Sequence, residues 1–198
     1  MKRTRGRPKQ YDEDTALQAA GEVFWAKGFS ATSLDDLAKA MEMNRPSIYR
    51  AFGDKEAVYR KALMQFCQGM EAAFERTMLA EDDVREALAS FYRDALAVYT
   101  SGVRPRGCLV MSTAVAAATS HPEIQADLLN VIRDLDQKIA KRLEQARQAG
   151  QLKVSFDATG RAAVAQSLLH SLSLRARAGE TPSRLRRMIK DGVEAVLC

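Results

Sequence analysis

Residues 32–55 read TSLDDLAKAMEMNRPSIYRAFGDK, two short helical patterns separated by a tight turn. Apolar residues recur in the first pattern at the spacing of one helix face: Leu34, Leu37, Ala38 and Met41. Asn44 can cap the second helix, and Pro46 suits its first turn, where the missing N–H carries no penalty. Ile48 and Phe52 then share its inner face. The pattern predicts a helix-turn-helix.

The predicted second helix leaves polar side chains on its outer arc. These are Arg45, Ser47, Tyr49 and Arg50. Thr32 and Ser33 mark the start of the first helix, and Lys55 stands near the start of a third helix, where a phosphate is favoured. A helix of this length fits the major groove of DNA. Because αα-hairpins with polar outer faces are common in helical proteins, the spacing alone is only moderately specific.

The first ten residues, MKRTRGRPKQ, form a basic arm. Its bases are Lys2, Arg3, Arg5, Arg7 and Lys9, and they equal the whole net charge of +5. A run with no acid and with Gly and Pro does not fold alone. We expect Arg3, Arg5 and Arg7 to reach into the minor groove. The alternative is a solubilising tail. Arm and helix together favour double-stranded DNA as a partner.

Several motifs resemble the tetracycline-repressor (TetR) family. They are FxxxGF at residues 24–29, TS at 32–33, LA at 37–38 and SIYxxFxxKxxV at 47–58. The resemblance covers residues 11–63. It implies an all-α subunit of about nine helices, a homodimer, an N-terminal DNA-binding domain and a larger C-terminal domain that holds an effector. Ala51 and Glu42 depart from the family pattern, and Glu42 stands in the turn where many relatives have Gly.

Carried onto this chain, the resemblance implies roles for individual residues. Thr32, Ser33, Tyr49 and Lys55 become phosphate contacts, and Arg45, Ser47 and Arg50 become candidates for base contacts. The predicted organisation is a flexible arm at 1–10, a helix-turn-helix DNA-binding domain at 11–55, and a helical effector-binding and dimerisation domain at 56–198.

The rest of the chain has helical periodicity almost throughout. The last two predicted helices carry apolar stripes that include Leu168, Leu172, Leu185, Ile189 and Val193. Paired twice over, these helices can form a four-helix dimer interface. The alternative is that both stripes face the core of their own subunit. The family resemblance favours the interface.

The effector region is predicted within the C-terminal helices. The family relation implies a mainly apolar pocket, lined here by residues such as Phe91, Tyr99, Met111 and Val115. Cys108 follows a loop with two arginines and precedes a helix, features that lower the pKa of a thiol, so it is a candidate sensor of oxidants or electrophiles. The alternative is inert filler, because free cysteines are often buried.

Composition sets further bounds. The three cysteines match no zinc pattern, the two histidines belong to no catalytic motif, and no apolar run is long enough to span a bilayer. We therefore expect no cofactor, no metal, no membrane and no catalysis, and a cytoplasmic protein. The prediction is a sequence-specific transcriptional regulator, a repressor released from a palindromic operator by a small-molecule or thiol-reactive effector. The alternatives are a nonspecific nucleoid-type binder and a helical enzyme.

Overall fold

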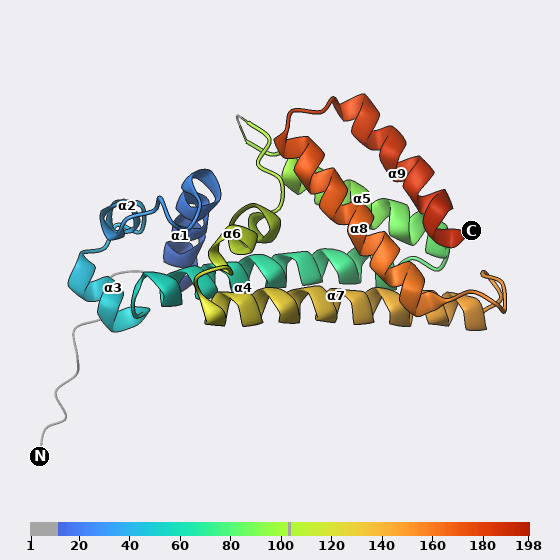
Figure 1. Cartoon of the computed structure of the whole chain (residues 1–198), viewed down its shortest axis with the longest axis horizontal. Helices are drawn as coiled ribbons and strands as arrows, with labels where there is room; N and C mark the ends of the chain where they lie inside the picture. Colours follow the sequence, from blue (N-terminus) through green and yellow to red (C-terminus); the bar gives the residue numbers. More distant parts are fainter. Residues whose placement is uncertain (1–11, 103) are drawn as a thin grey trace, which may run out of the picture. The chain divides into compact units, whose positions relative to one another are not determined.

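The structure, a computed structural model, describes residues 12–102 and 104–198, and within them it is built from helices joined by turns and loops (Figure 1). The α-helices are α1 (Glu13–Lys27), α2 (Leu34–Ala40), α3 (Arg45–Ala51), α4 (Lys55–Phe74), α5 (Val84–Tyr99), α6 (Val115–Ala117), α7 (Pro122–Gln148), α8 (Ala158–Arg177) and α9 (Pro182–Leu197). Two π-helical segments join them, η1 (Glu75–Leu79) and η2 (Val110–Ala114). No strand occurs in the described residues, so the all-α prediction is confirmed.

The chain divides into two compact units, and the division falls inside α4, between Gln65 and Phe66. The sequence predicted a boundary at the start of this helix. The difference arises because the first half of α4 completes the core of the N-terminal unit: Val58, Tyr59 and Leu63 are fully buried.

An aromatic cluster from α1, its following turn and α4 forms the centre of the N-terminal unit. The ring of Tyr59 packs edge-on against Phe24 and Phe29, with centroids 5.0 Å apart in each pair. Leu37 of α2 and Ile48 of α3 are also completely buried, as expected for the inner faces of a helix-turn-helix.

Local capping defines both helices of this module. The Ser33 hydroxyl accepts a hydrogen bond from the Asp36 N–H, and the Asp36 carboxylate accepts one from the Ser33 N–H, so the two residues form a capping box. The Asn44 side chain accepts from the Ser47 N–H at 2.9 Å and begins α3. In the turn between the helices, Glu42 has φ of 53°, the left-handed conformation that favours glycine. The turn therefore forms without glycine, at some backbone strain.

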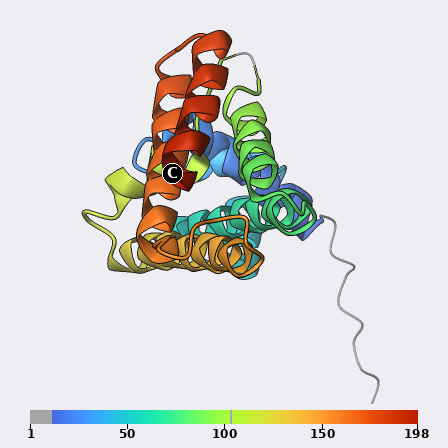
Figure 2. The same ribbon diagram turned by 90° about the vertical axis from the view of Figure 1, so that its right-hand side faces the viewer.

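The C-terminal unit is assembled around α8. This helix lies against α7 on one side and α9 on the other, and α5 packs on both α8 and α9 (Figures 1 and 2). The Tyr92 hydroxyl of α5 donates to the carbonyl oxygen of Ala165 in α8 at 2.8 Å, a buried link between two helices distant in sequence. No helix in the described part of the chain has the length and apolar character needed to cross a membrane.

The segment after α5 turns sharply onto α8. Gly107 has φ of 69°, and a Cβ atom added there would lie 2.8 Å from the carbonyl oxygen of Ser173, so this close backbone approach requires glycine. The following N–H, from Cys108, donates to the Ser173 hydroxyl at 2.8 Å. These contacts fix the position at which the next helical segment, η2 and α6, begins.

Candidate nucleic-acid interface

Four side chains of the helix-turn-helix face away from its core along α3. Arg45, Pro46, Tyr49 and Arg50 are exposed, with 52% of Tyr49 accessible, whereas Ile48 is completely buried. Ser47 is half-buried at the first turn. Hydrogen-bond donors and an aromatic ring thus line one exposed helix face, the arrangement that suits contact with a nucleic acid groove.

Arg45 is held by a carboxylate from the preceding helix. Its Nε donates to Asp35 Oδ1 at 2.7 Å and its Nη2 to Asp35 Oδ2 at 2.5 Å. The hydrogen bond from Arg45 lowers the pKa of the Asp35 carboxyl, and the same bond raises the pKa of Arg45. Both side chains are more than half exposed, so the pair contributes little to folding stability. Its effect is to fix where the guanidinium lies.

Two predicted phosphate contacts at the start of α2 are engaged within the protein. Thr32 is only 2% exposed, and its hydroxyl donates to the Gly28 carbonyl oxygen at 2.7 Å. This burial argues against a phosphate contact through its side chain. Ser33 is exposed, but its hydroxyl is part of the capping box with Asp36. A hydrogen bond from Lys27 is the main cause that lowers the pKa of Asp36, so the acid stays ionised beside the helix start.

Lys55 is also tied to its own unit. Its Nζ donates to the carbonyl oxygens of Phe29 at 3.2 Å and Thr32 at 3.1 Å, and lies 4.4 Å from the centroid of the Phe29 ring. An ammonium group has three N–H donors, and two of them are used by these carbonyl oxygens. The geometry favours a structural role for Lys55 over the predicted phosphate contact. The arm residues Arg3, Arg5 and Arg7 lie outside the described residues.

The predicted effector residues in the C-terminal unit fall into two groups. Phe91 and Tyr99 are buried at 1% exposure each, and the Cys108 thiol is buried beside Tyr99, to which it is hydrogen-bonded. The prediction of a low thiol pKa is wrong: burial raises the pKa of Cys108 above its ordinary value, outweighing hydrogen bonds from the backbone and from Tyr99. The proximity of arginines in sequence does not offset this desolvation.

Met111 and Val115 lie on the short helical stretch formed by η2 and α6. Met111 is half-buried, but Val115 is 46% exposed and therefore does not line an enclosed pocket in the described structure. The observed stretch is short and irregular, and it keeps one side open to solvent.

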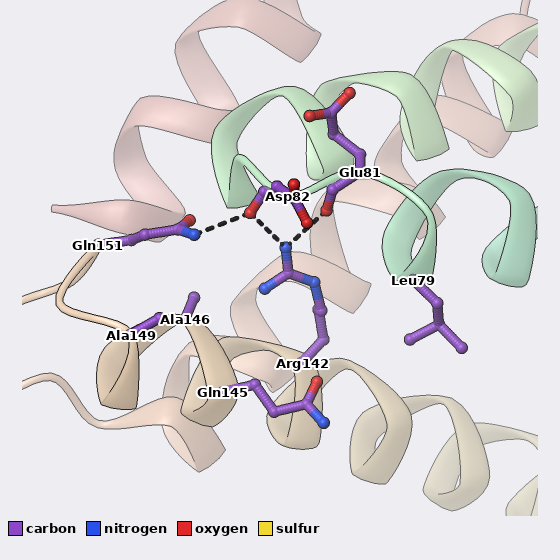
Figure 3. A pocket seen from close by; sticks show the side chains of 8 residues that line it. All are labelled: Leu79, Glu81, Asp82, Arg142, Gln145, Ala146, Ala149 and Gln151. Atoms are coloured by element: carbon purple, nitrogen blue, oxygen red, sulfur yellow. Dashed lines mark hydrogen bonds between the residues drawn. The ribbon is translucent and has the colours of Figure 1, made fainter.

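A surface pocket of 260 Å³ lies elsewhere in the C-terminal unit (Figure 3). Its lining residues are Leu79, Glu81, Asp82, Arg142, Gln145, Ala146, Ala149 and Gln151. Arg142 is 7% exposed and donates to the carbonyl oxygens of Met78, Glu81 and Asp82 at 2.6, 2.9 and 3.0 Å. This guanidinium links α7 to the turn before α5, so its role is structural. None of the predicted effector residues lines this pocket.

The predicted dimer stripes of α8 and α9 are largely internal. Leu172, Leu185, Ile189 and Val193 are at most 4% exposed within one subunit, so they cannot bury further surface against a second copy. For these four residues the prediction is wrong and the alternative, a face toward the subunit's own core, holds. Leu168 is half-buried, and the outward arc of α8 carries Val164 and Leu174, which is 70% exposed. The helical periodicity of the sequence predicted the apolar stripes, but it did not indicate which helices cover them.

Sequence reasoning did not find Asp35 as a partner of Arg45. The sequence shows only an acid and a base on consecutive predicted helices of one module. Such pairs are common, so this pattern does not predict an ion pair. In the described residues, no three His, Cys, Asp or Glu side chains gather to form a metal site.

The fold and the exposed α3 face define an all-helical protein with an N-terminal helix-turn-helix module. Residues 16–62 match the family model for bacterial regulatory proteins of the tetR family, and residues 84–191 match the tetracyclin repressor-like C-terminal domain. The chain belongs to the TetR family of bacterial regulatory proteins.

Individual relatives agree with this assignment. The HTH-type transcriptional repressor ComR of Escherichia coli K12 is 30% identical over 190 residues, which cover 93% of this chain and 89% of ComR. The E. coli K12 repressor BdcR is 32% identical over 55% of each chain. Among solved structures, a cysteine mutant of the TetR family regulator CifR, complexed with 26-bp double-strand operator DNA and apo-CifR, is similar with a TM-score of 0.85 and 32% identity. It covers 96% of this chain and 99% of its own.

Proposed function

We propose that the protein is a sequence-specific DNA-binding transcriptional repressor that reads its operator through α3. The observation that carries the proposal is the exposed face of this helix, where Arg45, Tyr49 and Arg50 stand outward over a core that includes Ile48. Membership of the TetR family, the repressor ComR and the operator complex of CifR support it. Repression is the expected output because occupying a promoter requires no further contact.

The exposed residues divide by chemistry. Arg45 and Arg50 carry guanidinium groups that can bind the O6 and N7 atoms of guanine, so we assign them to base contacts. Ser47 is a further candidate for a base contact, because its hydroxyl lies at the start of the same helix. The Tyr49 hydroxyl suits a phosphate oxygen, and the exposed Ser33 hydroxyl is a candidate of the same kind. For the N-terminal arm, the sequence alone supports insertion of Arg3, Arg5 and Arg7 into the minor groove.

Dimerisation would place two α3 helices on a palindromic operator, about one DNA turn or a multiple apart. The family makes a homodimer the expected state. Because the inner stripes are already covered, we assign the contact to the outward arc of α8, which carries Val164 and Leu174. A bacterial chromosome lies in the cytoplasm, so we propose that the protein acts there.

Release from DNA would follow effector binding in the C-terminal unit. We keep the predicted region around Phe91, Tyr99, Cys108 and Met111, whose side chains would suit a mainly apolar ligand. Because Phe91, Tyr99 and Cys108 are buried, such a ligand would have to displace part of this packing. To act as a signal, the ligand must bind the arrangement that does not fit DNA more tightly than the one that does. Neither effector binding nor release from DNA requires a catalytic group.

Selection of bound sites from random duplex DNA tests the proposal, with the parent protein and the Arg45→Ala and Arg50→Ala variants. The parent is expected to enrich a palindrome, and each variant to lose preference at defined base pairs. Uniform weakening across all sequences in both variants would reduce the two arginines to phosphate contacts. Failure of the parent to enrich any sequence would contradict the proposal itself.

A further inference from the structure

We propose that Asp35 is a positioning residue, which orients the Arg45 guanidinium so that its free edge meets a guanine. The inference rests on the proposed function, because it assigns one determinant of base preference within the same interface. Asp35 belongs to α2, not to the helix that reads the groove, so it would act through Arg45.

The geometry of the pair leaves the correct edge available. Asp35 binds the Nε and Nη2 side of the guanidinium, at 2.7 and 2.5 Å. In a planar guanidinium the Nη1 group and the second N–H of Nη2 then remain as a parallel pair of donors. That pair matches the O6 and N7 acceptors of guanine. No other described residue accepts a hydrogen bond from Arg45, so this edge is open to a ligand.

Both ends of the pair are anchored by local structure. The start of α2 is fixed by the Ser33–Asp36 capping box and by the ion pair between Lys27 and Asp36, 2.6 Å long. Arg45 is the first residue of α3, directly after its Asn44 cap. The carboxylate therefore restricts a long, flexible side chain before DNA arrives, which reduces the rotamer entropy lost on binding.

Asp35 has a second, opposite effect that makes the idea testable. It is 70% exposed beside a surface proposed to meet phosphates, so its charge repels DNA of every sequence. Removing the carboxylate should strengthen binding to DNA in general and weaken discrimination at the one base pair that Arg45 reads. An acid that only adjusted charge would produce the first effect without the second.

The test compares Asp35→Asn and Asp35→Ala with the parent, with Glu42→Gln as the matched control. Glu42 is an exposed acid in the same module. Replacing it with glutamine removes one negative charge and leaves the Asp35–Arg45 pair unchanged. The position at which Arg45→Ala loses base preference identifies the base pair that Arg45 reads. At that position, both Asp35 variants are expected to lose about tenfold in discrimination against other bases, with the other positions unchanged. Glu42→Gln should keep the full preference.

A double variant separates positioning from other effects. Once Arg45 is alanine, adding Asp35→Asn should cause no further loss of preference at that base pair. The inference is overturned if the Asp35 variants keep full discrimination there, if the double variant loses more than Arg45→Ala, or if Arg45→Ala affects no particular position. In each of these cases, the proposed function still stands if the parent protein enriches a palindrome. If the parent protein shows no base preference at all, the proposed function itself is contradicted. Fluorescence of Trp25, the one tryptophan in the chain, checks that each variant is folded.

Discussion

The ammonium group of Lys55 lies 4.4 Å from the centre of the Phe29 ring and donates to the Phe29 carbonyl oxygen. With a second bond to Thr32, it connects the start of α4 to the turn that follows α1. Lys55→Met keeps most of the aliphatic stem but removes these contacts. We expect the free energy of unfolding of the N-terminal unit to fall by about 1–2 kcal/mol.

The measurement for Lys55 is urea unfolding followed by Trp25 fluorescence, because Trp25 is buried in the same unit. The slope of binding affinity against salt concentration should not change, since the Lys55 ammonium is held by two carbonyl oxygens of its own unit and not by a phosphate. Lys39→Met, at an exposed site of α2, is the control and should unfold like the parent. A shallower salt slope with unchanged stability would reverse the assignment.

Glu42 is a second site where backbone geometry predicts stability. Its φ of 53° is strained for any residue with a Cβ atom, so Glu42→Gly should raise the free energy of unfolding. Because glycine also makes the unfolded chain more flexible, the net gain is expected to be about 0.5–1 kcal/mol. Glu42→Ala keeps the strain and is the matched control. If the free energy of unfolding of Glu42→Gly is no higher than that of Glu42→Ala, the turn is not strained.

Two thiols, the half-buried Cys67 and the buried Cys108, should make the protein sensitive to alkaline pH. Burial is the main cause that raises the pKa of Cys67 to about 12 and that of Cys108 above its ordinary value. Below the ordinary thiol pKa both states keep their protons, so stability is unaffected. Above it, the unfolded chain loses protons that the folded chain retains, and the free energy of unfolding falls by at most about 1.4 kcal/mol per pH unit for each thiol.

Chemical unfolding measured between about pH 8 and 10 checks this dependence. Cys67→Ser and Cys108→Ser should each flatten the decline in stability, whereas Cys198→Ser should not, because Cys198 is exposed. An equal decline in all three variants would contradict the role of burial. The same reasoning predicts that Cys108 reacts with alkylating reagents more slowly than Cys198 in the folded protein.

The proposed dimer contact depends on the outward arc of α8. Leu174 is 70% exposed there, and Leu174→Glu would place a charge in a surface meant to be buried. We expect light scattering to give a mass near twice 21.9 kDa for the parent and a shift toward the monomer for the variant. Val154→Glu changes an even more exposed aliphatic residue, in the loop before α8, and should remain dimeric. If Leu174→Glu stays fully dimeric, the dimer contact does not involve this arc of α8.

The helix-turn-helix could be predicted from the sequence because its signals are local. The Ser33 and Asn44 caps, the proline in the first turn of α3 and the buried pair Ile48 and Phe52 all occur where the pattern predicted them. Each depends on residues three or four positions apart, and such contacts follow from helix geometry alone.

The remaining features depend on contacts that sequence spacing does not encode. Arg142 reaches the Met78 carbonyl oxygen across 64 residues, and Asp35 reaches Arg45 across ten. For Cys108, the local rules on arginines and helix starts indicated a reactive thiol, but tertiary burial reversed the direction of the pKa shift. The apolar stripes of α8 and α9 fitted either a core or an interface, because periodicity shows which face is apolar and not what covers it.

Sequence-specific reading of DNA can be measured as the affinity of the protein for its selected palindrome and for a scrambled duplex of the same composition, over a range of salt concentrations. The palindrome is expected to bind at least about a thousandfold more tightly, and Arg45→Ala and Arg50→Ala are expected to narrow this difference in affinity. Equal affinity for both duplexes, with the same steep dependence on salt, would instead identify a nonspecific DNA-binding protein.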